Sequence, residues 1–277
     1  MDEWQEYVGK SQTQSDILTD GVRARFQSTL EGTSERHHAP LGVHWCCCLP
    51  DAPTAFLGAD GHPKRDVTTF LPPIPLPRRM WASSAVNFLA PISVGAVVER
   101  TSVIAAVKCK LGASGPLVFV AIDHTVTADG ITAVQERQTI VYREASTAAP
   151  APKRVAVQSD FSDWQWHRAV TPSSALLFRY SALTFNSHRI HYDLPYARDH
   201  EGYRGLVVHG PLTATLLLDL AAHALGGNRV KTFAFRGEAP AFADEALHLV
   251  GRADNARLTL AALGSDGRTI MSAHATI

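Results

Sequence analysis

The chain has 277 residues, of which 45% are hydrophobic and 19% charged, an ordinary balance for a globular protein. Lys plus Arg and Asp plus Glu number 26 each, so the charge balance favours neither a nucleic acid nor a membrane surface as a partner. The acidic N-terminus lacks an apolar signal core, and no run approaches the roughly 18 apolar residues of a membrane span. We therefore expect a cytoplasmic protein with one large domain or two smaller ones.

The four cysteines predict free thiols rather than disulfides or a metal site. Cys46, Cys47 and Cys48 are adjacent and cannot form ordinary bridges with one another, and their spacing from Cys109 matches no zinc template. Free, reduced thiols agree with a cytosolic location.

The first part of the chain divides into a helical pattern and a long loop. Apolar residues recur at near-helical spacing through residues 1–35, which predicts a helix there. Residues 51–78 are rich in Pro, Gly, Asp and Thr, which predicts an ordered loop without regular structure. Loops of this length in compact domains are often functional lids.

Residues 79–144 carry the pattern of an antiparallel sheet. Strands are predicted at 85–89, 97–110, 117–127 and 134–143, where β-branched and aromatic residues are frequent. A hairpin loop over 111–116 and a tight turn at Asp129-Gly130 connect them. Consecutive hairpins of this kind imply antiparallel pairing.

The order then repeats after residues 146–154, a Pro- and Ala-rich stretch that we interpret as a linker. Helices are predicted from 170 to 179, with a capped start at Thr171-Pro172, and from 211 to 225, ending at Gly226. Further strands are predicted at 230–237, 247–253, 256–263 and 269–277. We therefore expect two related α+β units, residues 1–145 and 155–277.

A polar cluster occupies residues 183–193, with the sequence Leu-Thr-Phe-Asn-Ser-His-Arg-Ile-His-Tyr-Asp. Burying so many polar groups is costly, which argues against a core segment. His209-Gly210 follows at a helix start, where unpaired N–H groups and the positive end of the helix dipole stabilise negative charge. A polar loop followed by such a helix start predicts an active site.

The cluster resembles a known signature. Residues 186–193, followed by His209-Gly210, are similar to the D-x-N-P-x-H motif and the helix-start H-G of the MaoC-like, or hydratase-2, family. The form Thr-Phe-Asn-x-His-x-Ile-His-Tyr-Asp most resembles a branch that holds mesaconyl-C4-CoA hydratases and hydroxyacyl-thioester dehydratases type 2. Residues 76–82 and 94–102 resemble the same branch. The resemblance implies a double hotdog, an α+β fold of two antiparallel sheets each wrapped around a helix.

The resemblance also implies roles for single residues. His191 would transfer the proton, because a neutral imidazole takes a proton from water at pH 7 and returns it. Asn186 stands where the family usually has a catalytic aspartate, and an amide can hold water but cannot act as acid or base. The N–H of Gly210 would bind the thioester carbonyl oxygen and stabilise the enolate. Asp193 and His188 would support the imidazole or the turn.

Substrate contacts are expected from Arg189, Arg179, Arg198 and His209, because guanidinium groups suit the phosphates of a coenzyme A thioester. The first half lacks a counterpart of the polar cluster, so it would be a degenerate unit that shapes the substrate site. No metal or redox cofactor is expected, and coenzyme A enters as part of the substrate. Hotdog sheets commonly pair edge to edge, so a homodimer is one candidate assembly.

The sequence thus predicts a hydro-lyase that reversibly hydrates an α,β-unsaturated acyl-CoA to a 3-hydroxyacyl-CoA. Hydration of mesaconyl-C4-CoA to citramalyl-CoA is the favoured reaction. Three alternatives stay open. One is a dehydratase of unbranched 3-hydroxyacyl thioesters. Another is a thioesterase, which normally needs a carboxylate that Asn186 does not supply. The last is a protein that binds acyl-CoA without catalysis.

Overall fold

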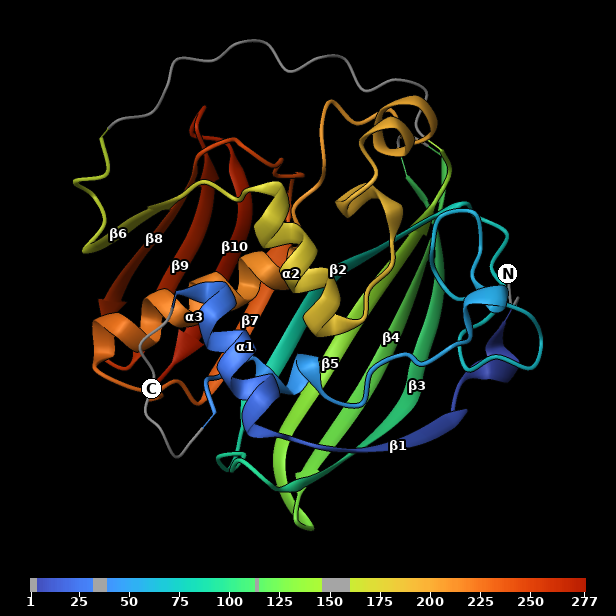
Figure 1. Cartoon of the computed structure of the whole chain (residues 1–277), viewed down its shortest axis with the longest axis horizontal. Coiled ribbons are helices and arrows are strands. Elements are labelled where there is room, and N and C mark those ends of the chain that lie inside the picture. The colour runs from blue at the N-terminus through green and yellow to red at the C-terminus, as the bar shows by residue number, and fades with distance from the viewer. Residues whose placement is uncertain (1–3, 32–38, 113–114, 146–159) are drawn as a thin grey trace.

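The computed structural model describes residues 4–31, 39–112, 115–145 and 160–277. In that part of the chain, ten strands form one sheet in the order β1-β3-β4-β5-β2-β7-β10-β9-β8-β6, and every pairing is antiparallel (Figure 1). The strands are β1 (Ser11–Ile17), β2 (Arg78–Phe88), β3 (Val97–Gly112), β4 (Gly115–Ala128), β5 (Ile131–Arg143), β6 (Trp166–Val170), β7 (Thr232–Gly237), β8 (Leu247–Asp254), β9 (Arg257–Gly264) and β10 (Thr269–Thr276).

The strand order is the same when it is read inward from either edge of the sheet. One half runs β1-β3-β4-β5-β2 and the other runs β6-β8-β9-β10-β7, so each half repeats the same topology. The two halves meet where β2 pairs with β7, from Ser83 opposite Arg236 to Asn87 opposite Thr232. The expected antiparallel α+β class is therefore confirmed, and the two halves join into one sheet, while the boundaries at residues 145 and 155 stay predictions. The linker predicted at 146–154 lies outside the described residues.

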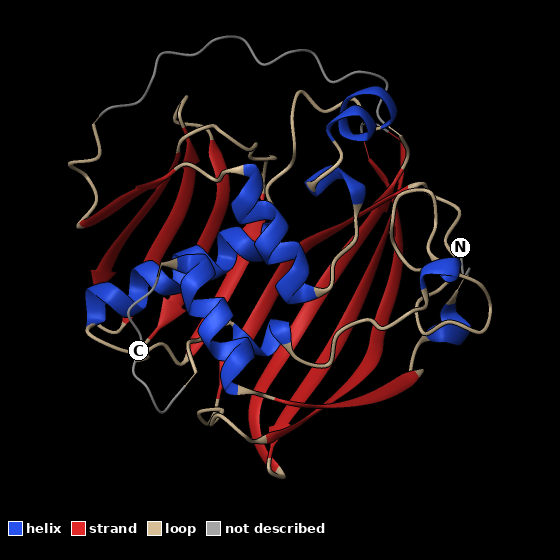
Figure 2. Ribbon diagram, in the orientation of Figure 1, coloured by secondary structure: helices blue, strands red, loops and turns tan. Residues whose placement is uncertain are grey.

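Three helices cover one face of this sheet, as Figure 2 shows: α1 (Asp20–Leu30), α2 (Ser174–Thr184) and α3 (Gly210–Leu225). The longest, α3, is buried along much of its length, with Leu212, Leu217 and Ala221 fully enclosed. A helix that is apolar on most sides belongs in a core. Among the described helices, none is both long and apolar enough to cross a membrane.

The start and end of α3 follow from its sequence. Pro211 lies in its first turn, where a missing N–H costs no helical hydrogen bond. Gly226 ends it with a φ of 72°, a left-handed conformation that glycine adopts without a steric penalty. The prediction for this helix is confirmed to within one residue at its start.

The helix predicted over 1–35 is wrong in its first half. Residues Ser11–Ile17 form the edge strand β1, and the helix begins only at Asp20. Thr19 caps this helix, because its side chain accepts a hydrogen bond from the N–H of Val22. Residues of β1 alternate between exposed and half-buried positions. The sequence pattern did not show this, because apolar residues through this part of the chain recur at helical spacing.

Other boundaries moved as well. Strand β2 begins seven residues before the predicted 85–89, and the short strand β6 was not predicted. The helix predicted from 170 starts at Ser174, and Ser173 rather than Thr171 caps it by accepting from the N–H of Leu176. The turn at Asp129-Gly130 is confirmed, with φ values of 49° and 81°.

The loop predicted at 51–78 closes the core of the first half. It holds a single 3-10 turn, η3 (Thr54–Phe56), and no strand until β2 begins at Arg78. Its apolar residues Ile74 and Leu76 are buried against a cluster that includes Tyr142 of β5. The four cysteines are unbonded, with Cys46, Cys47 and Cys48 buried and Cys109 exposed.

Candidate active site

The polar cluster forms a compact turn at the end of α2. Phe185 ends the helix with a φ of 48°, and the 3-10 turn η4 (Arg189–His191) follows. The side-chain oxygen of Asn186 accepts a hydrogen bond of 3.0 Å from the N–H of His188. Asparagine favours such turns because its side chain can satisfy a nearby backbone donor. The amide group of Asn186 therefore has its NH₂ left for other contacts.

His191 is held so that one ring nitrogen is free to accept a proton. It is buried, and its Nδ1 lies 2.7 Å from the carbonyl oxygen of Val207, which can only accept. Nδ1 therefore carries the proton and Nε2 carries a lone pair. Burial lowers the pKa of His191 to about 4, although the hydrogen bond to Val207 opposes that shift. The imidazole is thus neutral at pH 7.

His209 holds the His191 ring against the start of α3. The two rings stack with centroids 3.6 Å apart, and His209 is the residue immediately before Gly210. Nε2 of His209 shares a hydrogen bond of 2.9 Å with the hydroxyl of Ser181 in α2. Because His209 is only 1% exposed, its predicted contact with substrate stays a prediction, and its observed contacts position His191.

Gly210 begins α3, so its N–H has no acceptor within the helix. A side chain at this position would approach the backbone carbonyl of Trp81 in β2 to 3.8 Å. The first turn of α3 is therefore close to the strand through which the two halves join. The helix dipole adds partial positive charge here, which suits a developing oxyanion.

The loop of the first half brings in two residues that the sequence did not reveal as site residues. Nδ1 of His62 donates to a carboxylate oxygen of Asp60 at 2.9 Å. The His62 ring lies 4.1 Å from that of His188, which in turn lies 5.5 Å from that of His191. His62, His188, His191 and His209 thus form a continuous histidine row.

Each imidazole of the histidine row favours its neutral form. Burial, followed by the charge of Arg79, lowers the pKa of His62 to about 4, although Asp60 opposes that shift. Burial and the neighbouring His62 lower the pKa of His188 to about 2. The pKa of His209 is also well below its ordinary value, chiefly because of burial. A row of neutral imidazoles offers proton acceptors at pH 7.

The loop is fastened to the polar cluster by its backbone. The N–H of Arg189 donates to the carbonyl of Asp60 at 2.9 Å, and its guanidinium reaches the carbonyl of Ala59. The hydroxyl of Ser187 donates to the carbonyl of Gly61. Gly61 has a φ of 86°, and an added Cβ would lie 1.9 Å from the carbonyl oxygen of Ser187. Only glycine permits this close approach.

Asp193 supports the turn rather than the imidazole. One carboxylate oxygen accepts from the N–H of Tyr196 at 3.0 Å, and the other is 2.7 Å from the guanidinium of Arg189. That guanidinium also lies over the Tyr196 ring, 4.1 Å from its centroid. Val207, not Asp193, orients His191.

The other predicted arginines lie around the site rather than in the histidine row. Arg179 is exposed on α2, and Arg198 is exposed on the π-helical turn η5 (Tyr196–His200). The guanidinium of Arg198 reaches the carbonyl of Arg204 at 3.3 Å. Their predicted contacts with coenzyme A phosphates stay predictions.

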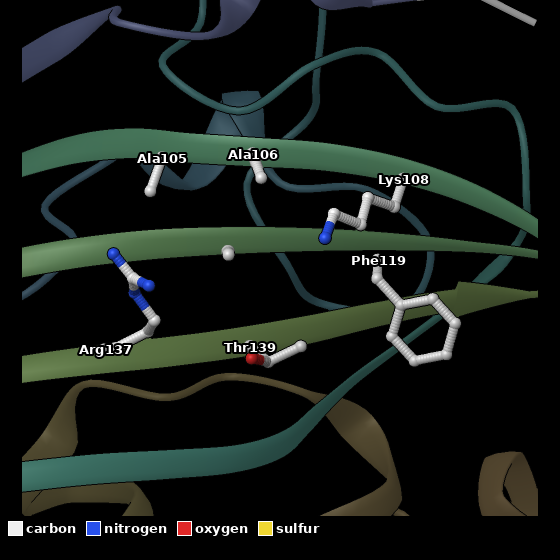
Figure 3. Close-up of a pocket in the computed structure, with 7 residues that line it drawn as sticks. Ala105, Ala106, Lys108, Phe119, Arg137 and Thr139 are labelled. Carbon is white, nitrogen blue, oxygen red and sulfur yellow. The ribbon is translucent and has the colours of Figure 1, made fainter.

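A concave region lies on the other face of the sheet, where the part of the chain that the structure describes places no α-helix. Side chains of Lys108, Phe119 and Arg137 from β3, β4 and β5 line it (Figure 3). These residues alternate along their strands with the buried residues that face the loop, such as Val118 and Val120. It is therefore separated from the histidine row by the sheet itself.

Comparison with known proteins agrees with this geometry. Residues 42–243 match the family of hydroxyacyl-thioester dehydratases type 2. A mesaconyl-C(4)-CoA hydratase from Chloroflexus aurantiacus is 41% identical over 98% of this chain and 96% of its own. A solved MaoC-like dehydratase superposes with a TM-score of 0.75 at 14% identity, covering 99% of this chain and 98% of that one. A Mycobacterium tuberculosis protein described as a double hotdog gives a TM-score of 0.59 at 13% identity, covering 97% and 96%.

The fold is a double hotdog, and the family match together with the relative at 41% identity identifies the chain as a hydro-lyase. Within that class, the chain belongs to the hydroxyacyl-thioester dehydratase type 2 family. The resemblance read from residues 183–193 and 209–210 is thereby confirmed at the level of family and fold.

Proposed function

We propose that this chain reversibly hydrates mesaconyl-C4-CoA to citramalyl-CoA. The observation that supports the proposal most directly is the neutral His191, whose Nδ1 is hydrogen-bonded to Val207 and whose Nε2 has no partner among the described residues, beside the start of α3. The 41% identity to a protein with this activity over nearly the whole chain supports the substrate.

The proposed reaction needs one proton carrier and one oxyanion donor. Nε2 of His191 removes a proton from water while the water oxygen bonds to Cβ of the alkene. The π electrons move toward the thioester carbonyl, whose oxygen receives the N–H of Gly210. The imidazolium then returns its proton to Cα, which completes the addition of one water. The NH₂ of Asn186 donates a hydrogen bond to that water, and the proposal includes no metal or redox cofactor.

A dehydratase of unbranched 3-hydroxyacyl thioesters is the second candidate, because the family match carries that description. The same residues would serve, since both reactions add water across the Cα–Cβ double bond of a thioester, and the two substrates differ in the groups that Cβ carries. The acyl group therefore has to be distinguished by experiment.

The test follows the ultraviolet absorbance of the enoyl thioester with mesaconyl-C4-CoA and, in parallel, crotonyl-CoA. We expect wild type to consume the first, and His191→Ala to lose about 10²–10⁴-fold in kcat. Turnover of crotonyl-CoA alone would keep the mechanism and replace the substrate. Release of free thiol would instead indicate a thioesterase, and binding without turnover of either thioester would indicate a non-catalytic protein.

A further inference from the structure

We infer that His62, oriented by Asp60, is a second catalytic imidazole that accepts a hydrogen bond from the attacking water. This inference rests on the proposed hydration. It assigns a chemical role to the first half of the chain, which the sequence had marked only as a substrate-shaping unit.

The hydrogen bonding of His62 repeats that of His191. Asp60 accepts the proton of Nδ1, as the carbonyl of Val207 does for His191, so the lone pair of His62 is also on Nε2. Within the described residues, Nε2 of His62 has no protein partner, and the side chain is 18% exposed. It is therefore open to a small molecule that enters the site.

The water in this reaction needs two acceptors. Its oxygen must point a lone pair at Cβ, and its orientation is fixed only when both hydrogens are bound. His191 accepts one of them. The oxygen of Asn186 is already engaged by the N–H of His188, so it is a poor second acceptor. His188 stands between His62 and His191 in the histidine row, but it is buried, whereas the side chain of His62 is 18% exposed. His62 is therefore the neutral imidazole that can fill this need.

The position of His62 is well determined by its surroundings. Its loop is joined to the polar cluster by hydrogen bonds from the backbone N–H of Arg189 and the hydroxyl of Ser187, with Gly61 packed directly on Ser187. Burial, and after it the guanidinium groups of Arg79 and Arg65, disfavour a charged His62, so the ring remains an acceptor at pH 7. Burial opposes the charged form of Asp60, but the hydrogen bond from His62 outweighs it and holds the pKa of Asp60 below its usual range.

No net proton transfer to His62 is required. Water loses one proton to His191, its oxygen bonds to Cβ, and its second hydrogen stays on the new hydroxyl group while it is hydrogen-bonded to His62. Asp60 acts through His62 and is a positioning residue. Replacing it with asparagine would offer Nδ1 a donor, move the ring proton to Nε2 and remove the acceptor.

The same residues have a competing interpretation as a metal site. Ligand atoms of Asp60, His62 and His188 lie within 4.8 Å of one another. However, Asp60 and His62 are directly hydrogen-bonded, and the rings of His62 and His188 lie 4.1 Å apart at 38°. The hydrogen bond already engages Nδ1 of His62 and a carboxylate oxygen of Asp60, so the inference is made for this hydrogen-bonded pair, and a metal ion is one outcome of the test.

The experiment compares wild type with His62→Ala, Asp60→Asn and the control His223→Ala, an exposed histidine at the far end of α3. Each is assayed on mesaconyl-C4-CoA and crotonyl-CoA, with circular dichroism and Tm confirming the fold. We expect kcat to fall about 10²-fold in both site variants, with KM changed less than about threefold. Added imidazole should restore His62→Ala at least about tenfold but not Asp60→Asn, and the control should match wild type.

Several results would overturn the inference. A folded His62→Ala that keeps wild-type kcat would do so, as would a loss that imidazole does not restore. Loss of wild-type activity in EDTA and its recovery with zinc would replace the inference with a metal site. Wild type that hydrates only crotonyl-CoA would refute the proposed substrate while His62 is still tested on crotonyl-CoA. Wild type inactive on both would refute both proposals.

Discussion

The two halves share one topology but enclose their cores differently. In the second half, the 16-residue α3 buries nine of its residues against the sheet. In the first half, the 11-residue α1 buries only three, and the loop before β2 closes the remaining core. The same loop carries Asp60 and His62 to the other half. A shorter helix thus leaves room for a loop that reaches the site.

The largest expected effect tests whether α3 contributes more to the stability of the core than α1 does. Leu217 in α3 is fully buried, whereas Leu30 ends α1 and is 7% exposed. We expect Leu217→Ala to lower the free energy of unfolding by about 2–5 kcal/mol. Leu30→Ala should cost less, because the end of a helix can relax. Urea denaturation of both variants measures the difference, and equal losses would contradict the comparison.

The next effect concerns the contact between the loop and the polar cluster. Gly61→Ala should destabilise the fold by about 1–3 kcal/mol and sharply reduce kcat, because its Cβ would overlap the carbonyl of Ser187. Gly95→Ala is the matched control, since Gly95 has a similar φ of 92° but nothing within 4 Å. Gly95→Ala should be destabilised only by its positive φ, without a steric overlap, and should retain activity. Equal kcat in the two variants would show that the loop does not serve the site.

Acid should lower the stability of the fold, because the histidine row is buried in its neutral form between the two halves. Folded His62 and His191 have pKa values of about 4, below the ordinary 6.5. As pH falls below about 6.5, the unfolded chain binds protons that the folded chain does not, so stability decreases down to about pH 4. Tm measured between pH 8 and 4.5 should therefore fall with pH. A Tm that is constant or highest at pH 5 would contradict this.

The smallest effect is expected at the exposed arginines. Arg179→Ala and Arg198→Ala should each raise KM for a coenzyme A thioester less than about fivefold, because exposed ion pairs contribute little. KM for the matching pantetheine thioester, which lacks the nucleotide phosphates, should not change. An equal rise with both substrates would place these arginines near the acyl group instead.

The sequence was informative where local patterns decide the structure. The apolar run of α3 between Pro211 and Gly226, and the hairpin at Asp129-Gly130, could be predicted because their signals lie within a few residues. Edge strand β1 could not, because its alternation is between exposed and half-buried positions and gives little hydrophobic contrast.

The site shows the same division. His191 and Gly210 were found because they belong to short motifs, although their catalytic roles stay predictions. His62 was missed because it reaches the site through a contact between Gly61 and Ser187, which are far apart in the sequence. In the sequence, Asp60-Gly61 looks like an ordinary turn.

The four cysteines differ in reactivity, which allows the protein to be labelled at one position. Burial raises the pKa of Cys46, Cys47 and Cys48, that of Cys47 to about 12, so these buried thiols do not readily form the thiolate that alkylating reagents attack. Cys109 is exposed on β3, away from the histidine row. A maleimide dye should therefore attach to the native protein at Cys109, giving a fluorescent reporter on the first half without any engineered residue.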